Sequence, residues 1–130
     1  MARILIIEDN AINMKLAVLL VRLAGHTVLE AVDAETGLVL ARSELPDLIL
    51  MDVQLPGMNG FAATTMLKND PVTAHIPVII LTALAMSRDQ DRARDAGCDA
   101  YITKPLHYQE LHDAIEWMMP RPTTRWIGTG

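Results

Sequence analysis

Hydrophobic residues form short unbroken runs along the chain, and these runs alternate with stretches of helical periodicity. Three of the runs, ILII, LILM and VIIL, are apolar at every position. Such runs are typical of strands that are covered on both faces of a parallel sheet. The predicted strands span residues 3–7, 27–31, 48–51, 78–81 and 100–102.

Between the predicted strands, apolar residues recur every three or four positions, which indicates helices with one buried face. Two such faces are formed by Ala34, Leu38, Ala41 and Leu45 and by Leu111, Ala114, Ile115 and Met118. The predicted helices span 11–24, 34–44, 60–68, 87–96 and 107–118. Five strand–helix units without a repeat or a linker predict an α/β fold with a doubly wound, five-stranded parallel sheet.

The predicted helix 87–96 is unusually polar, with Ala93 and Ala96 as its only apolar residues. Because it can bury little surface, most of its stability must come from neighbouring elements. Two interpretations stay open for this helix: a weakly anchored part that moves beside a functional site, or a solvated surface helix.

The final segment, PRPTTRWIGTG, has two prolines, two glycines and no periodicity. We expect residues 120–130 to form a flexible C-terminal tail after a single domain of residues 1–119. Docking of Trp126 on the domain is the alternative interpretation.

Composition narrows the classes of function. At 130 residues the chain fits one domain, and its net charge of −5 does not favour binding to nucleic acid, which needs clustered lysine and arginine. No apolar stretch approaches the roughly 18 residues of a membrane span, and the first predicted strand leaves no room for a signal peptide. The single cysteine, Cys98, cannot form an internal disulfide. These features indicate a cytoplasmic protein.

Polar residues follow most of the predicted strands at the point where each strand ends. They are Glu8 and Asp9 after the first strand, Asp52 after the third, Thr82 after the fourth, and Thr103, Lys104 and Pro105 after the fifth. Open α/β sheets bind ligands at the carboxyl ends of their strands, near the point where the strand order reverses. If the order is 2-1-3-4-5, the three carboxylates gather in one place. The competing interpretation is that Asp9 or Asn10 only caps the next helix.

Three neighbouring carboxylates repel one another, since two charges about 4 Å apart cost about 4 kcal/mol at an effective dielectric constant of roughly 20. Either one group keeps its proton or a cation lies among them. Oxygen ligands without histidine or cysteine suit Mg²⁺. A nearby hydroxyl and lysine, Thr82 and Lys104, complete the groups of a phosphoryl-transfer site. Asp52, at the end of the central strand, is the best acceptor because carboxylates form aspartyl-phosphates.

Four segments, EDN, LILMDVQLPGMNG, VIILTALAM and GCDAYITKP, resemble the motifs of receiver domains of two-component response regulators in type, order and spacing. The resemblance covers roughly residues 2–119 and implies the flavodoxin-like receiver fold of the CheY-like superfamily, with strand order 2-1-3-4-5. Within this family, EDNAINMKL and IPVIILTALAM look most like single-domain cell-division regulators of the DivK type. Receivers of hybrid histidine kinases share features of these segments, so an excised hybrid-kinase receiver is the alternative.

The resemblance implies that Asp52 accepts a phosphoryl group from a phosphohistidine on a histidine kinase or phosphotransfer protein. It also implies Mg²⁺ as the cofactor. Asp9, Asp52 and the backbone carbonyl of Gln54 would be direct ligands, and Glu8 would act through water. Glu8 stands where aspartate is more common in the family, and the charge is the same.

Other residues of the resemblance concern phosphate binding and output. Thr82, Lys104 and the backbone N–H of Ala83 would bind phosphate oxygens. Tyr101 matches the aromatic residue that turns inward on activation, and the peptide bond between Lys104 and Pro105 would be cis. A downstream protein would bind the face formed by helix 4, strand 5 and helix 5. The domain would be a monomer or weak dimer that promotes its own phosphorylation and dephosphorylation without being a conventional enzyme.

Two other classes of protein share parts of this pattern. A phosphatase of the haloacid-dehalogenase type would also use Asp52 as a nucleophile, but it needs a second aspartate where this chain has Gln54. A flavin-binding module needs aromatic and hydroxyl-rich phosphate loops, which the sequence lacks. The glycine-rich motifs of P-loop, serine-hydrolase and dinucleotide sites are also missing.

The four histidines, His26, His75, His107 and His112, do not form a metal-ligand spacing with Cys98. We expect them to be solvated or to cap helices. Cys98 is expected to be a small buried side chain.

Overall fold

The computed structural model describes residues 2–83 and 87–119, and for residues 87–89 the backbone alone. The expectations about the tail 120–130 and Trp126 concern residues outside these ranges. The described elements are β1 (Arg3–Ile7), α1 (Ala11–Leu23), β2 (Thr27–Ala31), α2 (Ala34–Glu44), β3 (Leu48–Asp52), α3 (Gly60–Asn69), β4 (Val78–Thr82), α4 (Ser87–Ala96), β5 (Ala100–Thr103) and α5 (Tyr108–Met118).

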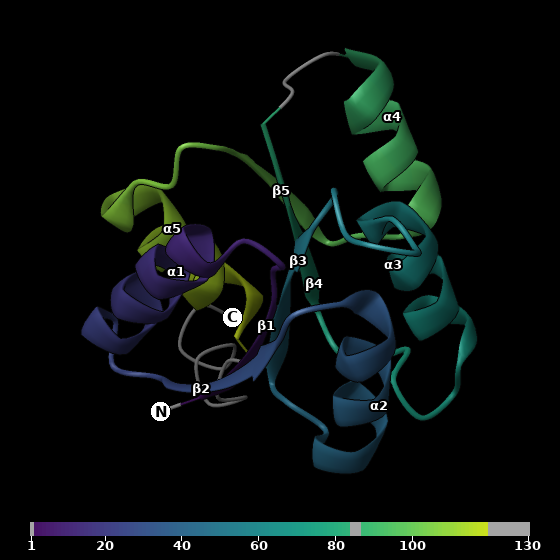
Figure 1. Cartoon of the computed structure of the whole chain (residues 1–130), viewed down its shortest axis with the longest axis horizontal. Coiled ribbons are helices and arrows are strands. Elements are labelled where there is room, and N and C mark those ends of the chain that lie inside the picture. Colours follow the sequence, from purple (N-terminus) through teal and green to yellow (C-terminus); the bar gives the residue numbers. More distant parts are fainter. Residues whose placement is uncertain (1, 84–86, 120–130) are drawn as a thin grey trace, which may run out of the picture.

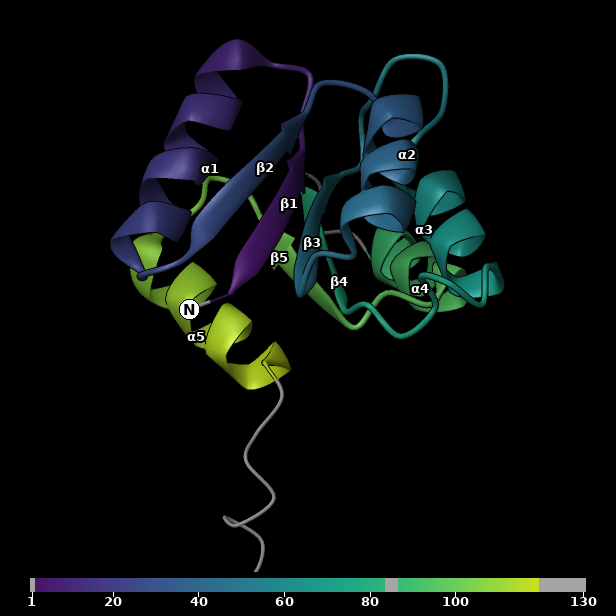
Figure 2. The ribbon, with the colours of Figure 1, turned by 90° about the horizontal axis from the view of Figure 1, so that it is seen from below.

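The five strands form one parallel sheet in the order β2-β1-β3-β4-β5, which confirms the predicted fold class and topology. Helices α1 and α5 cover one face of the sheet, and α2, α3 and α4 lie on the other (Figure 1). The perpendicular view shows the same division (Figure 2). None of the helices in the described part of the chain has the length and apolar character that crossing a bilayer requires.

The central strands supply both halves of the hydrophobic core. Every residue of β3 and β4 is buried. Along β1, Ile4 and Ile6 pack with α1 and α5, whereas Leu5 and Ile7 pack in the core cluster on the opposite face. Successive side chains of a strand point to opposite faces, so an unbroken apolar run serves two cores at once.

The observed element bounds differ from the predicted ones by at most one residue. Asp52 and Thr82 are the last residues of β3 and β4, although the prediction placed both just after the strands. Their polar side chains mark the strand ends, but their backbones still pair, with Asp52 beside Leu81 and Thr82 beside Thr103.

The packed face predicted for α2 is wrong at its last position. Ala34 and Ala41 are buried, but Leu45 is 48% exposed. Leu45 is the C-cap of α2 and adopts a left-handed conformation with φ of 47°. The reversal of the backbone at the cap turns its side chain away from the face that the helical period predicts.

Helix α4 is attached to the domain mainly through α3. Its two apolar residues, Ala93 and Ala96, are 1% and 6% exposed, as expected for the only apolar positions. The guanidinium carbon of Arg92 also lies 4.6 Å from the centroid of the Phe61 ring on α3. A small buried surface therefore holds this helix.

Candidate functional site

Three carboxylates meet where β1 and β3 end. One oxygen each from Glu8, Asp9 and Asp52 lies within 4.8 Å of the others. Glu8 is 3% and Asp52 4% exposed, whereas Asp9 is exposed. The neighbouring positions of β1 and β3 in the sheet bring these residues together, as expected for the 2-1-3-4-5 order.

The residue that caps α1 is not one of the three carboxylates of the acidic cluster. The side chain of Asn10 accepts hydrogen bonds from the backbone N–H groups of Ile12 and Asn13, both at 3.0 Å. The N–H of Asn10 donates to Oε2 of Glu8 at 3.1 Å. Asn10 is therefore the N-cap, and the interpretation of Asp9 as the cap is wrong.

Lys104 supplies a cation within the cluster. Its Nζ donates to Oδ1 of Asp52 at 2.7 Å and to Oε1 of Glu8 at 3.1 Å. Burial alone would lower the pKa of Lys104, but the hydrogen bonds to Asp52 and Glu8 outweigh this effect and raise the pKa above its usual value. Lys104 thus relieves part of the carboxylate repulsion that the sequence argument assigned to a metal or a proton.

The chain turns back sharply after Asp52, and Gly60 makes this turn possible. The N–H of Gly60 donates to the carbonyl of Val53 at 2.8 Å. A Cβ at Gly60 would collide with the carbonyl oxygen of Asp52. Gly57 in the same loop has φ of 80°, which favours glycine. These features let α3 start against the backbone of β3 beside the Asp52 carboxylate.

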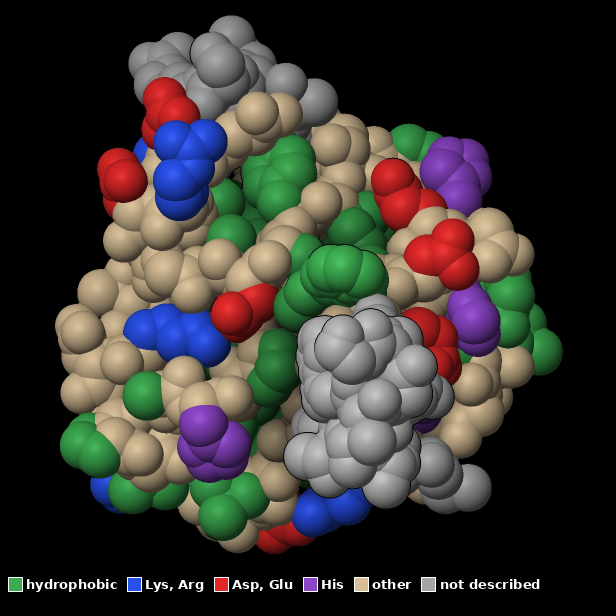
Figure 3. Space-filling model, turned by 180° about the vertical axis from the view of Figure 1, so that it is seen from behind, with side chains coloured by type: hydrophobic (Ala, Val, Ile, Leu, Met, Phe, Trp, Pro, Cys, Tyr) green, Lys and Arg blue, Asp and Glu red, His purple; other side chains and the backbone are tan. Residues whose placement is uncertain are grey.

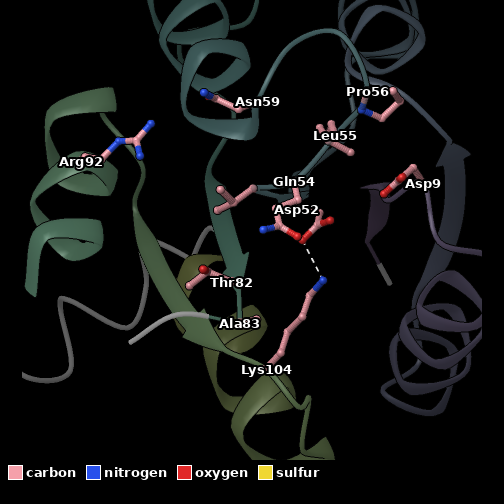
Figure 4. A pocket seen from close by; sticks show the side chains of 11 residues that line it. Asp9, Asp52, Gln54, Leu55, Pro56, Asn59, Thr82, Ala83, Arg92 and Lys104 are labelled. Atoms are coloured by element: carbon pink, nitrogen blue, oxygen red, sulfur yellow. Dashed lines mark hydrogen bonds and ion pairs between the residues drawn. The ribbon is translucent and has the colours of Figure 1, made fainter. Parts of the chain in front are cut away.

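A cavity of about 570 Å³ opens above Asp52. Figure 4 shows Asp52 near its centre, joined to Lys104, with Asp9 on one side and Arg92 on the other. The cavity is lined by Asp9, Asp52, Val53, Gln54, Leu55, Pro56, Asn59, Thr82, Ala83, Arg92 and Lys104. A small anionic group that enters this cavity would meet the Asp52 carboxylate, the Lys104 ammonium group and Thr82 together.

The donors of the acidic cluster fit a hard divalent cation. All three are carboxylates, and Asp9 and Asp52 both face the cavity. Magnesium prefers oxygen ligands and usually keeps several waters, which an open cavity accommodates. Asp9, Asp52 and the carbonyl of Gln54 are the groups that could hold Mg²⁺ here, with Glu8 behind them.

Tyr101 and Pro105 lie outside the main cavity. Tyr101 on β5 is partly buried and lines a separate cavity of about 250 Å³ beside Cys98 and α4. The peptide bond between Lys104 and Pro105 is cis, as the resemblance implies. Cys98 is only partly buried, contrary to the expectation of a buried side chain, and burial raises the pKa of its thiol.

The expectation of a solvated or capping role is wrong for His26. Its side chain is only 8% exposed, and its Nδ1 accepts the backbone N–H of Ala2 at 3.0 Å. Nε2 lies 3.8 Å from Oε1 of Glu116, beyond hydrogen-bonding distance. Burial lowers the pKa of His26. The sequence offered no signal for this contact, which joins the residues just before β1 and β2.

Two features near the site escaped the sequence argument. The first is Arg92, whose polar helix gave no indication of which side chain would reach the cavity. The second is an exposed apolar face on α1, formed by Ile12, Leu16, Leu19 and Leu23, which are 78%, 41%, 55% and 63% exposed. The sequence did contain a signal for this exposed face. The apolar residues of α1 cover more of the helix surface than one buried face requires.

Parallel topology and an acidic cavity at the strand ends define the class of receiver domains. The chain belongs to this family, since the model of the response regulator receiver domain matches residues 4–116. Among its relatives is the polar-differentiation response regulator DivK of Brucella anthropi. The two sequences are 43% identical over 113 residues, which cover 87% of this chain and 92% of that protein. The DivK protein of Brucella ovis gives the same figures.

Solved structures support the same assignment. A putative response regulator from Chloroflexus aurantiacus superposes with a TM-score of 0.88 and 29% identity, covering 92% of this chain and 98% of that chain. The receiver domain of a sensor histidine kinase from Pseudomonas aeruginosa, with a magnesium ion coordinated in its active site cleft, has a TM-score of 0.83 and 30% identity. That match covers 90% of this chain and 97% of that one.

Proposed function

We propose that the protein is a single-domain response regulator that accepts a phosphoryl group on Asp52 and signals through protein contacts. The observation that carries this proposal is the position of Asp52. Its carboxylate is buried at the base of an open cavity, 2.7 Å from the Lys104 ammonium and grouped with Glu8 and Asp9. A carboxylate in this setting is held in place and yet accessible from one side.

In the proposed reaction, an oxygen of Asp52 attacks the phosphorus of a phosphohistidine, and the bond from phosphorus to the imidazole nitrogen breaks. Lys104 holds the attacking carboxylate and offers positive charge to the phosphoryl oxygens. Thr82 and the N–H of Ala83 line the same cavity and would bind the remaining oxygens. Mg²⁺, when bound by Asp9, Asp52 and the Gln54 carbonyl, supplies further charge neutralisation.

The phosphoryl group would act as a switch through Thr82 and Lys104. One charge-assisted hydrogen bond is worth about 1.5–3 kcal/mol, and two therefore give roughly 3–6 kcal/mol. Moving an equilibrium from 1:99 to 99:1 needs about 5.5 kcal/mol. Tyr101, only two positions along β5 from Thr103, which pairs with Thr82, would then turn inward and reshape the face of α4, β5 and α5 for a downstream protein.

The phosphohistidine protein would dock on α1. This helix starts directly after the acidic pair, and its exposed apolar face extends away from the site. A second cavity of about 340 Å³, lined in part by Leu16, Pro105 and Leu106, adjoins Glu8 and Lys104. An apolar partner surface seated here would bring its histidine to the mouth of the Asp52 cavity. An exposed apolar helix face beside a reactive site is typical of a protein-binding surface.

The charge distribution is consistent with a protein partner. On the face shown in Figure 3, basic side chains of the described residues lie in separate small groups, several of them next to acidic ones. The net charge of −5 also does not favour nucleic acid as a partner. The protein would act in the cytoplasm, which agrees with its single, unpaired cysteine. It would be a monomer or weak dimer.

The relatives favour a stand-alone regulator over the receiver of a hybrid kinase. The chain spans 92% of the length of the DivK proteins that it matches at 43% identity, whereas the receiver of the Pseudomonas aeruginosa kinase is 30% identical. A phosphatase function is disfavoured because Gln54 stands where a catalytic acid is needed. We therefore propose a phosphoacceptor that promotes its own phosphorylation and dephosphorylation, and not a conventional enzyme.

Intact-mass spectrometry tests this proposal. After incubation with acetyl phosphate and Mg²⁺, the protein should gain the mass of one phosphoryl group, which hydroxylamine removes. Asp52→Asn should abolish the adduct, and chelation of the metal should do the same. The matched control is Asp113→Asn, an exposed carboxylate on α5 that should leave the adduct intact. A hydroxylamine-resistant adduct on serine or histidine would overturn the assignment.

A further inference from the structure

We propose that Arg92 is a second phosphate-binding cation of the Asp52 cavity and contacts the phosphoryl group of the entering donor. The inference rests on the proposed function and adds to it a residue from α4, a helix that none of the assigned roles at the acceptor site involves. Arg92 lines the same cavity as Asp52 and Lys104. In Figure 4 its guanidinium comes from the side of the cavity opposite Asp9.

The guanidinium is positioned by an aromatic ring. Its carbon lies 4.6 Å from the centroid of Phe61, and Phe61 is only 6% exposed in the first turn of α3. A ring face attracts a cation without neutralising its charge. The five N–H donors of arginine lie in the guanidinium plane, so contact with the ring leaves the donors at its edge available for an anion.

Arg94, in the last turn of α4, is placed differently from Arg92. Arg94 lies 3.4 Å from Asp91, its side chain is 76% exposed, and it lines the separate cavity beside Cys98 and Tyr101. Residues two positions apart on a helix do not share a face. Only Arg92 of this pair therefore lines the acceptor cavity.

Phosphate is the ligand chemistry that fits. Lys104 already donates to Asp52 and Glu8, so it shares its charge between these carboxylates and an entering group, and a second cation would add to what it offers. A doubly charged phosphoryl group has three acceptor oxygens, and a guanidinium can bind two of them at once. The ligand class is thus a phosphoryl donor such as an acyl phosphate, a phosphoramidate or a protein phosphohistidine.

Arg92 forms and breaks no covalent bond in this scheme. With acetyl phosphate, an oxygen of Asp52 attacks phosphorus, the bond from phosphorus to the acetyl oxygen breaks, and acetate leaves with the electron pair. Arg92 holds the phosphoryl oxygens while this exchange takes place. Because the contact is to the phosphoryl group, its effect should not depend on the leaving group.

The experiment compares initial rates of Asp52 phosphorylation at low donor concentration with Mg²⁺ present. Acetyl phosphate and phosphoramidate are the two donors, since they share the phosphoryl group but release acetate and ammonia. Arg92→Gln should lower the rate about tenfold with both, the size of one charged contact at a partly open site. Arg94→Gln, the matched control, should change the rate less than about twofold. Phe61→Leu removes the ring that positions Arg92 and should lower the rate by less than Arg92→Gln does.

Magnesium binding separates a direct contact from a distorted site. Mg²⁺ should bind Arg92→Gln at least as tightly as the native protein, because a nearby positive charge is removed. Four results would overturn the inference: an unchanged rate, an equal loss in Arg94→Gln, a loss confined to acetyl phosphate, or weakened Mg²⁺ binding in Arg92→Gln. Failure of the proposed function looks different, because the native protein would then gain no phosphoryl group from either donor, and the inference would fall with it.

Discussion

The Lys104 ammonium nitrogen lies 2.7 Å from Oδ1 of Asp52, although 52 positions separate the two residues in the chain. The same nitrogen contacts Glu8 at 3.1 Å. One cation therefore serves two carboxylates that are almost completely buried. Removing one partner from a buried ion pair leaves a charge without compensation, which costs more than the pair contributes.

Lys104→Met should therefore destabilise the protein strongly. We expect the free energy of unfolding to fall by about 3–5 kcal/mol, measured by chemical denaturation near neutral pH without metal. Lys15→Met removes a lysine that is exposed on α1 and should change stability by less than about 0.5 kcal/mol. Adding Asp52→Asn to Lys104→Met should restore part of the loss. Equal effects of the two lysine substitutions would contradict the role given to the buried cation.

Magnesium should stabilise the fold, because a ligand that binds only the native state adds RT ln(1 + [L]/Kd). At a concentration of about a hundredfold Kd the gain is about 2.7 kcal/mol, measured by thermal unfolding with and without Mg²⁺. Asp9→Asn should abolish most of this gain. It should also raise metal-free stability, because no described hydrogen bond or ion pair joins Asp9 to Lys104. The exposed Asp95 on α4 provides the control Asp95→Asn, which should keep the native response.

The exposed face of α1 should matter for a protein donor but not for a small one. Leu16→Ser and Leu19→Ser should reduce phosphoryl transfer from a histidine kinase or phosphotransfer protein by about tenfold, since apolar anchors dominate such contacts. Phosphorylation by acetyl phosphate should stay unchanged. The control is Val39→Ser on α2, which removes an apolar side chain that is 66% exposed. Equal losses with both kinds of donor would indicate damage to the site instead of to docking.

Tyr101 should affect output and leave phosphorylation nearly intact. Tyr101→Ala should weaken binding of a downstream protein while Asp52 is still phosphorylated, because Tyr101 lies outside the acceptor cavity. Beryllofluoride should shift NMR amide signals from Thr82 to Lys104 and into α5. Met66→Ala removes an apolar side chain that is 50% exposed on α3, outside the proposed output face, and should leave partner binding unchanged. Shifts limited to the cavity would favour a passive phosphate relay.

His26 should make stability depend on pH. Because burial lowers its pKa in the folded state from the usual 6.5, the unfolded chain binds a proton first as pH falls. Stability from neutral His26 is therefore fully present above pH 6.5 and is lost as pH falls through the folded-state pKa. Glu116 opposes this shift, whereas His112 adds to it.

Unfolding free energies between about pH 7.5 and pH 5 measure this dependence. In His26→Asn the amide oxygen can still accept the Ala2 N–H, and the slope of stability with pH should become smaller. His75→Asn changes an exposed histidine and should keep the native slope. A native slope in His26→Asn would assign the dependence to other groups.

The elements that could be predicted are those whose signal is local. The strands β1, β3 and β4 were visible because each is buried on both faces, and Asp52 was visible because a carboxylate ends such a run. The resemblance to receiver domains identified Thr82 and Lys104 by their motifs. Leu45 was misplaced because the helical period carries no information on the left-handed cap that ends α2.

The sequence by itself determined the order of strands and helices and the presence of three carboxylates at neighbouring strand ends. Only the tertiary structure decided how the charges pair, that Arg92 of α4 lines the acceptor cavity, and that His26 is buried against the N–H of Ala2. Periodicity reports whether a side chain is buried. Its partner depends on how distant elements pack, and Lys104 reaches Glu8 across 96 positions of the chain.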